Sequence, residues 1–325
     1  MKLILLVVII LSTGIKLYCL NFYDIPPADA KLYNYYGSEI AKGNGFPEDA
    51  PLIHNIGFSF VLAFLFQYAD SNDIILQKIF TLFLSSLLIP LMFMFLRNWF
   101  EVKYSVIGSM FVAFDPRIIQ NSILGVSDML YLVLFFASLV FLVKGRYHMS
   151  FLFAGLATVT RLEGIILLPI LFLLSTKMSY RYTVLFFIPI ILVGLLYVYE
   201  IGEDNISYQI KKEIATVNTS FDDKKNTDNG QPSFLKRIIN SFVYMGWFTF
   251  PMFFFFVPTS FYFLKKQKKI KPLILISCII ISATTGVWAY FDAYDTRYFF
   301  HMYPFLTMLS LFTWQKFFPV RNSVI

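Results

Sequence analysis

The chain has 325 residues, of which 58% are hydrophobic and only 14% are charged, and its mean hydropathy is +0.66. Soluble proteins are about a quarter charged, and a soluble domain of this length could not bury so much apolar surface in one core. The composition therefore excludes an ordinary soluble protein and predicts an all-α polytopic membrane protein. The formal net charge is +7, but the distribution of the charges along the chain is more informative about the topology than their sum.

The apolar residues fall into segments of the length that a membrane requires. A spanning helix needs about 20 mainly apolar residues, or somewhat fewer. No cleavage site follows the first segment, so we expect a retained transmembrane helix rather than a removed signal. The candidate segments are 3–20, 53–69, 74–96, 104–120, 128–143, 148–160, 164–176, 182–199, 238–264, 272–291 and 298–318.

The basic residues orient these segments. Loops rich in Lys and Arg stay in the cytoplasm, and the run at 265–271 is the strongest marker of this kind. Segment 53–69 follows two prolines and ends in acidic residues, so we expect it to lie in the outer leaflet without crossing. About ten crossings then remain, with both ends of the chain cytoplasmic. The other loops that this topology places in the cytoplasm are 97–103, 144–146 and 177–181.

The acidic residues show the opposite distribution. In this topology only Glu101 of the 20 acidic residues lies in a cytoplasmic loop. Acidic residues contribute little to orientation, so insertion does not require this asymmetry. We therefore expect one integral membrane domain over 1–325, with its functional site on the external face, whether periplasmic, extracellular or luminal. Two external loops are long enough to contribute to that site, 21–73 and 200–237.

The first external loop contains a short helical pattern that begins at Asp29. Glycines at 43 and 45 should end this helix. A carboxylate at the start of a helix commonly accepts backbone N–H bonds, and the sequence alone favours this capping role for Asp29. The apolar positions that predict a surface helix are Leu32, Tyr33, Tyr36 and Ile40.

Further ionisable residues lie at the outer ends of predicted helices. Asp128 opens one helix, and Arg161 and Glu163 form a tight external link between two others. Charged residues at membrane depth are costly, so they usually pair or serve a function. For Arg161 and Glu163 both readings remain open, mutual neutralisation across the turn and a functional role.

Arg297 enters the outer end of the final apolar segment, with Tyr298 beside it. The planar guanidinium of an arginine binds phosphate through two parallel hydrogen bonds. The sequence offers a second reading, in which Arg297 pairs with Asp292 or Asp295 as an interfacial anchor.

Together these motifs resemble the GT-C class of membrane glycosyltransferases, and in particular protein O-mannosyltransferases and bacterial aminoarabinose lipid A transferases. The likeness covers residues 1–180 well and 290–305 modestly. The motifs that carry it, in chain order, are Asp29-Ala-Lys-Leu-Tyr33, Gly43-Asn-Gly-Phe46, Pro51–His54, Asp115-Pro116, Ser122, Asp128, Ala154–Arg161, Arg297-Tyr298 and Pro304.

The resemblance implies a GT-C-type helix bundle and an inverting sugar transfer from a polyprenyl-phosphate donor to an external acceptor. Asp29 would be the general base, and Asp128 would orient the acceptor or assist that base. Arg297, Arg161 and Tyr298 would bind the donor phosphate. The remaining positions expected to contact substrate are Tyr33, Glu48, His54 and Glu163.

The chain also departs from that pattern. The first loop lacks an Asp-x-Asp motif, and Ser127-Asp128-Met129 lacks the second acid of the oligosaccharyltransferases. Both differences argue against an oligosaccharyltransferase and against a tightly bound metal ion, which leaves room for a weakly bound divalent cation and predicts no other cofactor.

The expected partners are the lipid-linked sugar, membrane lipids, and an acceptor that is protein, lipid or glycan, but no nucleic acid. Two other functions remain open at this point. One is a lipid or solute carrier or flippase, and the other is a non-catalytic membrane subunit.

Overall fold

The computed structural model describes residues 2–22, 26–47, 56–174, 179–201, 235–236, 238–240, 251–264, 277, 280–286 and 296–319. Every regular element among these residues is a helix, and they contain no strand. The predicted all-α class is therefore confirmed. Two helices of the described part are long and apolar enough to cross a membrane, residues Leu3–Leu20 of α1 (Lys2–Leu20) and the whole of α4 (Ile74–Leu96).

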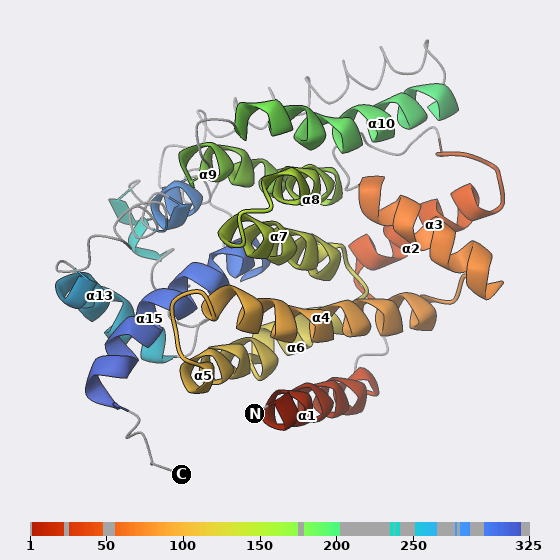
Figure 1. Cartoon of the computed structure of the whole chain (residues 1–325). Coiled ribbons are helices and arrows are strands. Elements are labelled where there is room, and N and C mark those ends of the chain that lie inside the picture. The colour runs from red at the N-terminus through yellow and green to blue at the C-terminus, as the bar shows by residue number, and fades with distance from the viewer. Residues whose placement is uncertain are drawn as a thin grey trace.

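Five helices lie side by side and form the body of the molecule (Figure 1). They follow one another in the order α1, α4, α7 (Asp128–Val143), α8 (Tyr147–Thr160) and α10 (Thr183–Ile201), and each contacts the next. All are strongly apolar, and the central helices α4 and α7 bury many large side chains against their neighbours. We call this group the helix stack.

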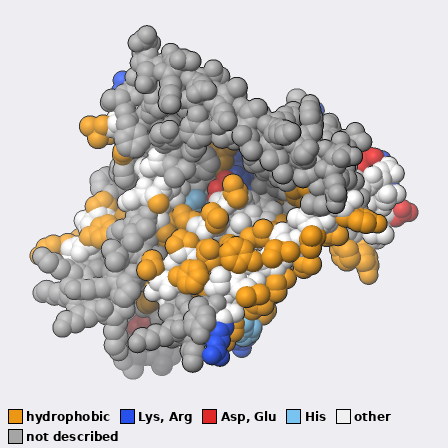
Figure 2. Space-filling model, turned by 90° about the horizontal axis from the view of Figure 1, so that it is seen from above, with side chains coloured by type: hydrophobic (Ala, Val, Ile, Leu, Met, Phe, Trp, Pro, Cys, Tyr) orange, Lys and Arg blue, Asp and Glu red, His pale blue; other side chains and the backbone are white. Residues whose placement is uncertain are grey.

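The outer surface of the described helices is also largely apolar. Figure 2 shows a broad band of hydrophobic side chains across one face. In α1 most of the large side chains are exposed, Leu3 among them, and α10 exposes Ile191 and Leu195 in the same way. Soluble proteins rarely expose contiguous apolar patches above a few hundred Å². A surface of this kind favours contact with lipid.

The predicted segment 104–120 is wrong as a single helix. It forms α5 (Val102–Ala113) and α6 (Pro116–Ser122), which are separated at Asp115. The Asp115 carboxylate accepts hydrogen bonds from the backbone N–H groups of Arg117 and Ile118 at 2.8 and 3.0 Å. Proline at the first position of α6 suits a helix start but could not continue α5. The Asp-Pro pair therefore ends one helix and begins the next.

Two shorter helices, α2 (Ala28–Ala41) and α3 (Ile56–Ala69), pack against each other at one end of the helix stack (Figure 1). Gly43 follows α2 with a φ of +81°, a left-handed conformation that glycine adopts without strain. The predicted helix and its glycine stop are thus confirmed. The predicted capping role of Asp29 is wrong, because the N-cap is Pro27 and no side chain caps the helix.

Several apolar segments begin with a turn of 3₁₀-helix. These turns are η1 (Leu162–Ile166) before α9 (Leu167–Leu174), η2 (Ser179–Tyr182) before α10, and η3 (Thr296–Met302) before α15 (Tyr303–Phe317). Helix α15 packs against α5 and against α13 (Pro251–Leu264). Most of the predicted loop 200–237, all of the basic loop 265–271 and most of segment 272–291 lie outside the described residues.

The two ends of the helix stack differ in the loops they carry. Lys144 Nζ, just after α7, lies 3.8 Å from Met94 Sδ near the end of α4. The hydroxyl of Tyr104 donates to the carbonyl oxygen of Phe318 at 3.2 Å. The basic loops 97–103 and 144–146 therefore share one end, the basic end. The start of α4 lies roughly 35 Å away, since 23 helical residues rise 1.5 Å each.

Helices α8 and α10 approach so closely that a side chain would not fit between them at Gly155. A Cβ atom there would collide with the backbone carbonyl group of Phe186. We expect Gly155→Ala to lower the free energy of unfolding by about 1–3 kcal/mol, because overpacking forces backbone shifts. Thermal unfolding of the purified protein in detergent measures the change.

The matched control is Gly194→Ala in α10, where a Cβ atom would meet nothing within 4 Å. This substitution should be neutral or stabilising by up to about 1 kcal/mol, because alanine favours the helix over glycine. Equal melting temperatures for the two variants would contradict the close contact between α8 and α10.

Candidate active site

A buried arginine lies at the end of the helix stack opposite the basic end. Arg161 follows α8 directly, and only 8% of it is exposed. Its Nη1 donates to Asp128 Oδ1 at 2.6 Å. Its Nη2 and Nε donate to the two carboxylate oxygens of Glu163 at 2.8 and 3.3 Å. Arg161 and Glu163 therefore do pair, and Asp128 completes a trio that we call the buried triad.

The backbone after α8 brings Glu163 into position. The N–H of Arg161 still bonds to the carbonyl of Ala157 at 2.8 Å, and η1 then folds back over the last turn of the helix. A Cβ atom on Gly164 would lie 2.5 Å from the backbone nitrogen of Thr158, so only glycine allows this approach. The fold-back places the Glu163 carboxylate against the guanidinium two residues earlier.

The charges of the buried triad depend on one another. Burial alone would lower the pKa of Arg161, but the carboxylates of Asp128 and Glu163 raise that pKa above its ordinary value. Burial would raise the pKa of Glu163, but Arg161 holds it below its ordinary value of 4.5. Arg161 thus stays charged, and two carboxylates occupy its hydrogen-bonding groups.

A second ion pair lies closer to the surface. Arg297 Nη1 donates to Asp29 Oδ2 at 3.1 Å, and the exposed side-chain fractions are 23% and 46%. The two residues are 268 positions apart in the chain, and they come from η3 and from the first turn of α2. The sequence offered Asp292 and Asp295 as partners of Arg297, but both lie outside the described residues. We call this contact the surface pair.

Two tyrosines connect the surface pair with the buried triad. Tyr298 follows Arg297, and its ring centre lies 5.6 Å from the guanidinium carbon of Arg161. Tyr33 lies one helical turn after Asp29, packs edge-on against Phe58 and lies near Arg161.

The structure therefore brings most of the predicted site residues together: Asp29, Tyr33, Asp128, Arg161, Glu163, Arg297 and Tyr298. Glu48 and His54 lie outside the described residues. Figure 2 shows acidic and basic side chains close together near the middle of the face it draws, beside the band of hydrophobic ones.

Gln77 is a positioning residue that the sequence reading missed. It is fully buried near the start of α4, and its side-chain N–H₂ group donates to the carbonyl oxygens of Ala30 and Gly125 at 3.0 and 2.5 Å. These two bonds tie α2, which carries Asp29, to the loop that leads into Asp128. The sequence signal for it was a polar amide near the start of a largely apolar helix, followed directly by Lys78.

His301 is a second buried polar residue near the site. Its Nε2 lies 2.9 Å from the hydroxyl of Thr284, and it interacts electrostatically with Glu163 and Arg161. Asp115, by contrast, has a structural role, since it caps α6 and accepts a hydrogen bond from the hydroxyl of Tyr303.

Within the described ranges, no group of three or more His, Cys, Asp or Glu side chains is placed to hold a metal ion. The site instead combines a half-exposed carboxylate, a partly exposed guanidinium and a buried charged group behind them. Such a set can accept a proton and bind an anion within one small region. No family model matches the chain, and no curated protein matches its sequence.

The buried triad should make the stability of the fold depend on pH. The pKa of Glu163 is lowered in the folded state, so its ion pair stabilises the fold above the ordinary pKa near 4.5. This contribution is lost as the pH falls through the lowered folded-state value. Glu163→Gln should cost about 1–3 kcal/mol at neutral pH, because charge-assisted hydrogen bonds are weakened.

Thermal unfolding of both proteins over a pH series measures this effect. The difference in melting temperature between wild type and Glu163→Gln should shrink as the pH falls below about 4.5. Glu101→Gln is the control, since Glu101 is exposed at the basic end and forms no ion pair with another described residue. A constant difference at every pH would show that Glu163 is not ionised in the fold.

Proposed function

We propose that the chain is an inverting glycosyltransferase that moves a sugar from a polyprenyl-phosphate donor to an acceptor hydroxyl on the non-cytoplasmic side of a membrane. The surface pair is the observation that carries this proposal. It holds a half-exposed carboxylate against a guanidinium at the end of the helix stack opposite the basic end, which we call the acidic end. A general base and a phosphate-binding cation are the two groups that such a transfer requires.

In the proposed reaction Asp29 takes the proton from the acceptor hydroxyl. The acceptor oxygen then forms a bond to the anomeric carbon of the sugar, on the face opposite the phosphate. The bond between that carbon and the phosphate oxygen breaks, and the electron pair leaves with the polyprenyl phosphate. The configuration at the anomeric carbon inverts in a single displacement.

Arg297 binds the donor phosphate in this mechanism and stabilises the negative charge that develops on it. Arg297 is the better candidate for this role, because Arg161 is buried and already held by two carboxylates. Arg161 instead supports the site from behind, where it orients Asp128 and lies against Tyr298. Asp128 orients the acceptor through this network or assists the base, and Tyr33 and Glu163 are the further residues proposed to contribute to substrate binding.

The proposal includes a membrane topology of about ten crossings with both termini cytoplasmic. Its support is the arrangement of charge, since basic loops 97–103 and 144–146 share one end of the helix stack and the candidate active site lies at the other. The described helices α1 and α4 have the length and composition of membrane spans. Helices α2 and α3 then lie at the outer surface.

Asp29→Asn tests the function and the base together. We expect sugar transfer from a radiolabelled polyprenyl-phosphate monosaccharide panel to fall by roughly 10²–10⁴-fold in proteoliposomes, because a general base contributes this much to the rate. Asp73→Asn is the matched control, since its side chain caps α4 and asparagine caps equally well.

The outcome also separates the other two functions. A carrier or flippase would move lipid or solute without releasing sugar from any donor. A non-catalytic subunit would tolerate Asp29→Asn in the cell while the protein folds normally. Transfer that survives Asp29→Asn unchanged would assign the base elsewhere, with Asp128 as the next residue to replace.

Arg297→Lys tests the phosphate contact separately. Lysine keeps the positive charge but loses the planar fork, so we expect a higher KM for the donor and a kcat reduced by about 10²–10³-fold. Steady-state kinetics at saturating acceptor measure both constants. Arg181→Lys changes an exposed arginine outside the site and should leave both unchanged. A donor KM that does not respond to Arg297→Lys would contradict the phosphate contact.

A further inference from the structure

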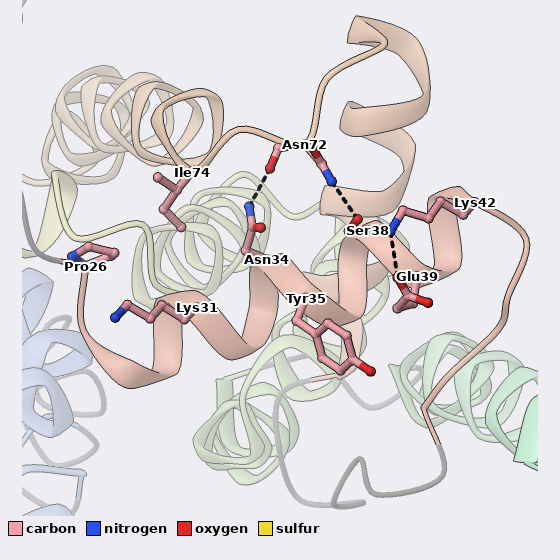
Figure 3. Close-up of a pocket in the computed structure, with 9 residues that line it drawn as sticks. All are labelled: Pro26, Lys31, Asn34, Tyr35, Ser38, Glu39, Lys42, Asn72 and Ile74. Atoms are coloured by element: carbon pink, nitrogen blue, oxygen red, sulfur yellow. Dashed lines mark hydrogen bonds and ion pairs between the residues drawn. The ribbon is translucent and has the colours of Figure 1, made fainter.

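A polar groove runs along α2 on the side turned away from Asp29. Its volume is about 470 Å³, within the range of roughly 300–1,000 Å³ that is common for small-molecule pockets. Successive residues of an α-helix are about 100° apart, so Lys31 and Tyr35 face nearly opposite to Asp29 and Tyr33. Figure 3 shows the residues of this groove. The groove is therefore distinct from the surface pair.

The floor of the groove is a chain of hydrogen-bonded polar side chains. The Asn34 amide donates to the backbone carbonyl of Asn72 at 3.1 Å, and the Asn72 amide donates to the hydroxyl of Ser38 at 2.8 Å (Figure 3). An amide has two N–H groups and an acceptor oxygen, so each of these side chains has further groups to offer a ligand. The network holds these groups in place before a ligand arrives.

The charge of the groove is small. Lys42 pairs with Glu39 at 2.7 Å, and Asn44 also donates to Glu39 at 2.8 Å. Lys31 is therefore the lining residue that leaves a positive charge uncompensated by another lining residue. No arginine is among the described residues that line the groove. This composition does not suit a tightly held phosphate, and it suits an uncharged ligand with many hydroxyl groups.

Tyr35 adds an aromatic surface to this polar lining. It is 49% exposed and stands at the edge of the groove (Figure 3). A tyrosine presents an apolar ring face together with a polar hydroxyl. Sugar rings match this combination, because their C–H groups pack on an aromatic face while their hydroxyl groups bond to neighbouring amides.

The groove continues beyond its first hollow. A second hollow of about 280 Å³ shares Ser38, Lys42 and Asn72 with the first. It extends to Gln67 in the last turn of α3 and to Asp70 just after that helix. The combined shape is elongated and follows α2. It therefore suits several linked sugar units better than one small molecule.

We propose that this groove binds an uncharged, hydroxyl-rich glycan chain, and that this chain is the acceptor for the transfer at Asp29. The statement that this glycan is the acceptor rests on the proposed function. The groove opens beside Pro26 and Lys31, at the end of α2 that carries Asp29. Lys31 lies only about 3 Å along the helix axis from Asp29 but on the other side of a helix about 10 Å wide, so a glycan that leaves the groove there reaches the base by passing around the N-terminal end of α2.

Binding is measured first, without any donor. The full-length protein in phosphatidylcholine nanodiscs is titrated with neutral hexasaccharides built from glucose, mannose or galactose, and saturation-transfer NMR reports contact. We expect at least one hexasaccharide to bind. Tyr35→Ala should raise its Kd by about tenfold, since the substitution removes the aromatic face on which a sugar ring would pack. Tyr35→Phe keeps the ring and should stay within about threefold.

Tyr68→Ala is the matched control, because Tyr68 is 81% exposed on α3 and lines neither hollow. Its Kd should equal that of wild type. The proposal is overturned if no hexasaccharide binds, if Tyr35→Ala binds as well as Tyr68→Ala, or if glycerophosphate displaces the hexasaccharide. The last result would identify a site for lipid head groups.

A second measurement tests the acceptor role. With the lipid-linked donor present, Tyr35→Ala should lower transfer to the hexasaccharide about tenfold while sugar release to water stays at the wild-type rate. Equal losses in both would show that Tyr35 acts on the donor side and would overturn the acceptor role. If wild type releases no sugar from any donor, the proposed function fails, and the binding result still decides whether the groove holds a glycan.

Discussion

The buried guanidinium of Arg161 is the constraint on which the acidic end of the molecule depends. Removing an ion from water is costly, and only close partners with good geometry compensate for this loss. Two carboxylates from different elements meet that need, Asp128 at the start of α7 and Glu163 in η1. The chain must therefore bring α7, the end of α8 and η1 to one point. The same requirement fixes Tyr298, whose ring lies over the guanidinium.

The surface pair between Asp29 and Arg297 has the opposite character. Both side chains are partly exposed, and ion pairs in contact with solvent contribute little to stability. A pair of this kind can open at low cost when a substrate competes for either partner. The donor phosphate would replace the Asp29 carboxylate at Arg297, and the carboxylate would then be available to the acceptor hydroxyl. In the proposed catalysis the buried triad holds the site in place, and the surface pair opens to admit the substrates.

Local signals made part of this arrangement predictable from sequence. The α2 helix follows from apolar spacing and its glycine stop, and Arg161 with Glu163 follows from adjacency. The capping role of Asp29 was wrong because α2 begins at Ala28, so Pro27 is the N-cap, and the Asp29 carboxylate contacts Arg297, 268 positions away. The Asp128 partner of Arg161 and the bonds of Gln77 were equally invisible, because both depend on how separate helices pack. Contacts between residues within one or two helical turns can be predicted from the sequence, whereas contacts between residues of separate helices cannot.

Helix α2 contributes to both the candidate active site and the polar groove, because its two faces carry different residues. One face carries Asp29 and Tyr33 toward the buried triad, and the other carries the polar groove with Tyr35. Gln77 holds the backbone of this helix at Ala30, between the two sets, so a shift of α2 would move Asp29, the proposed base, together with the groove. A transferase that acts on a glycan chain needs the base and the acceptor site in constant register. In the proposed mechanism the short helix α2 provides this register, because the buried amide of Gln77 holds its backbone at Ala30.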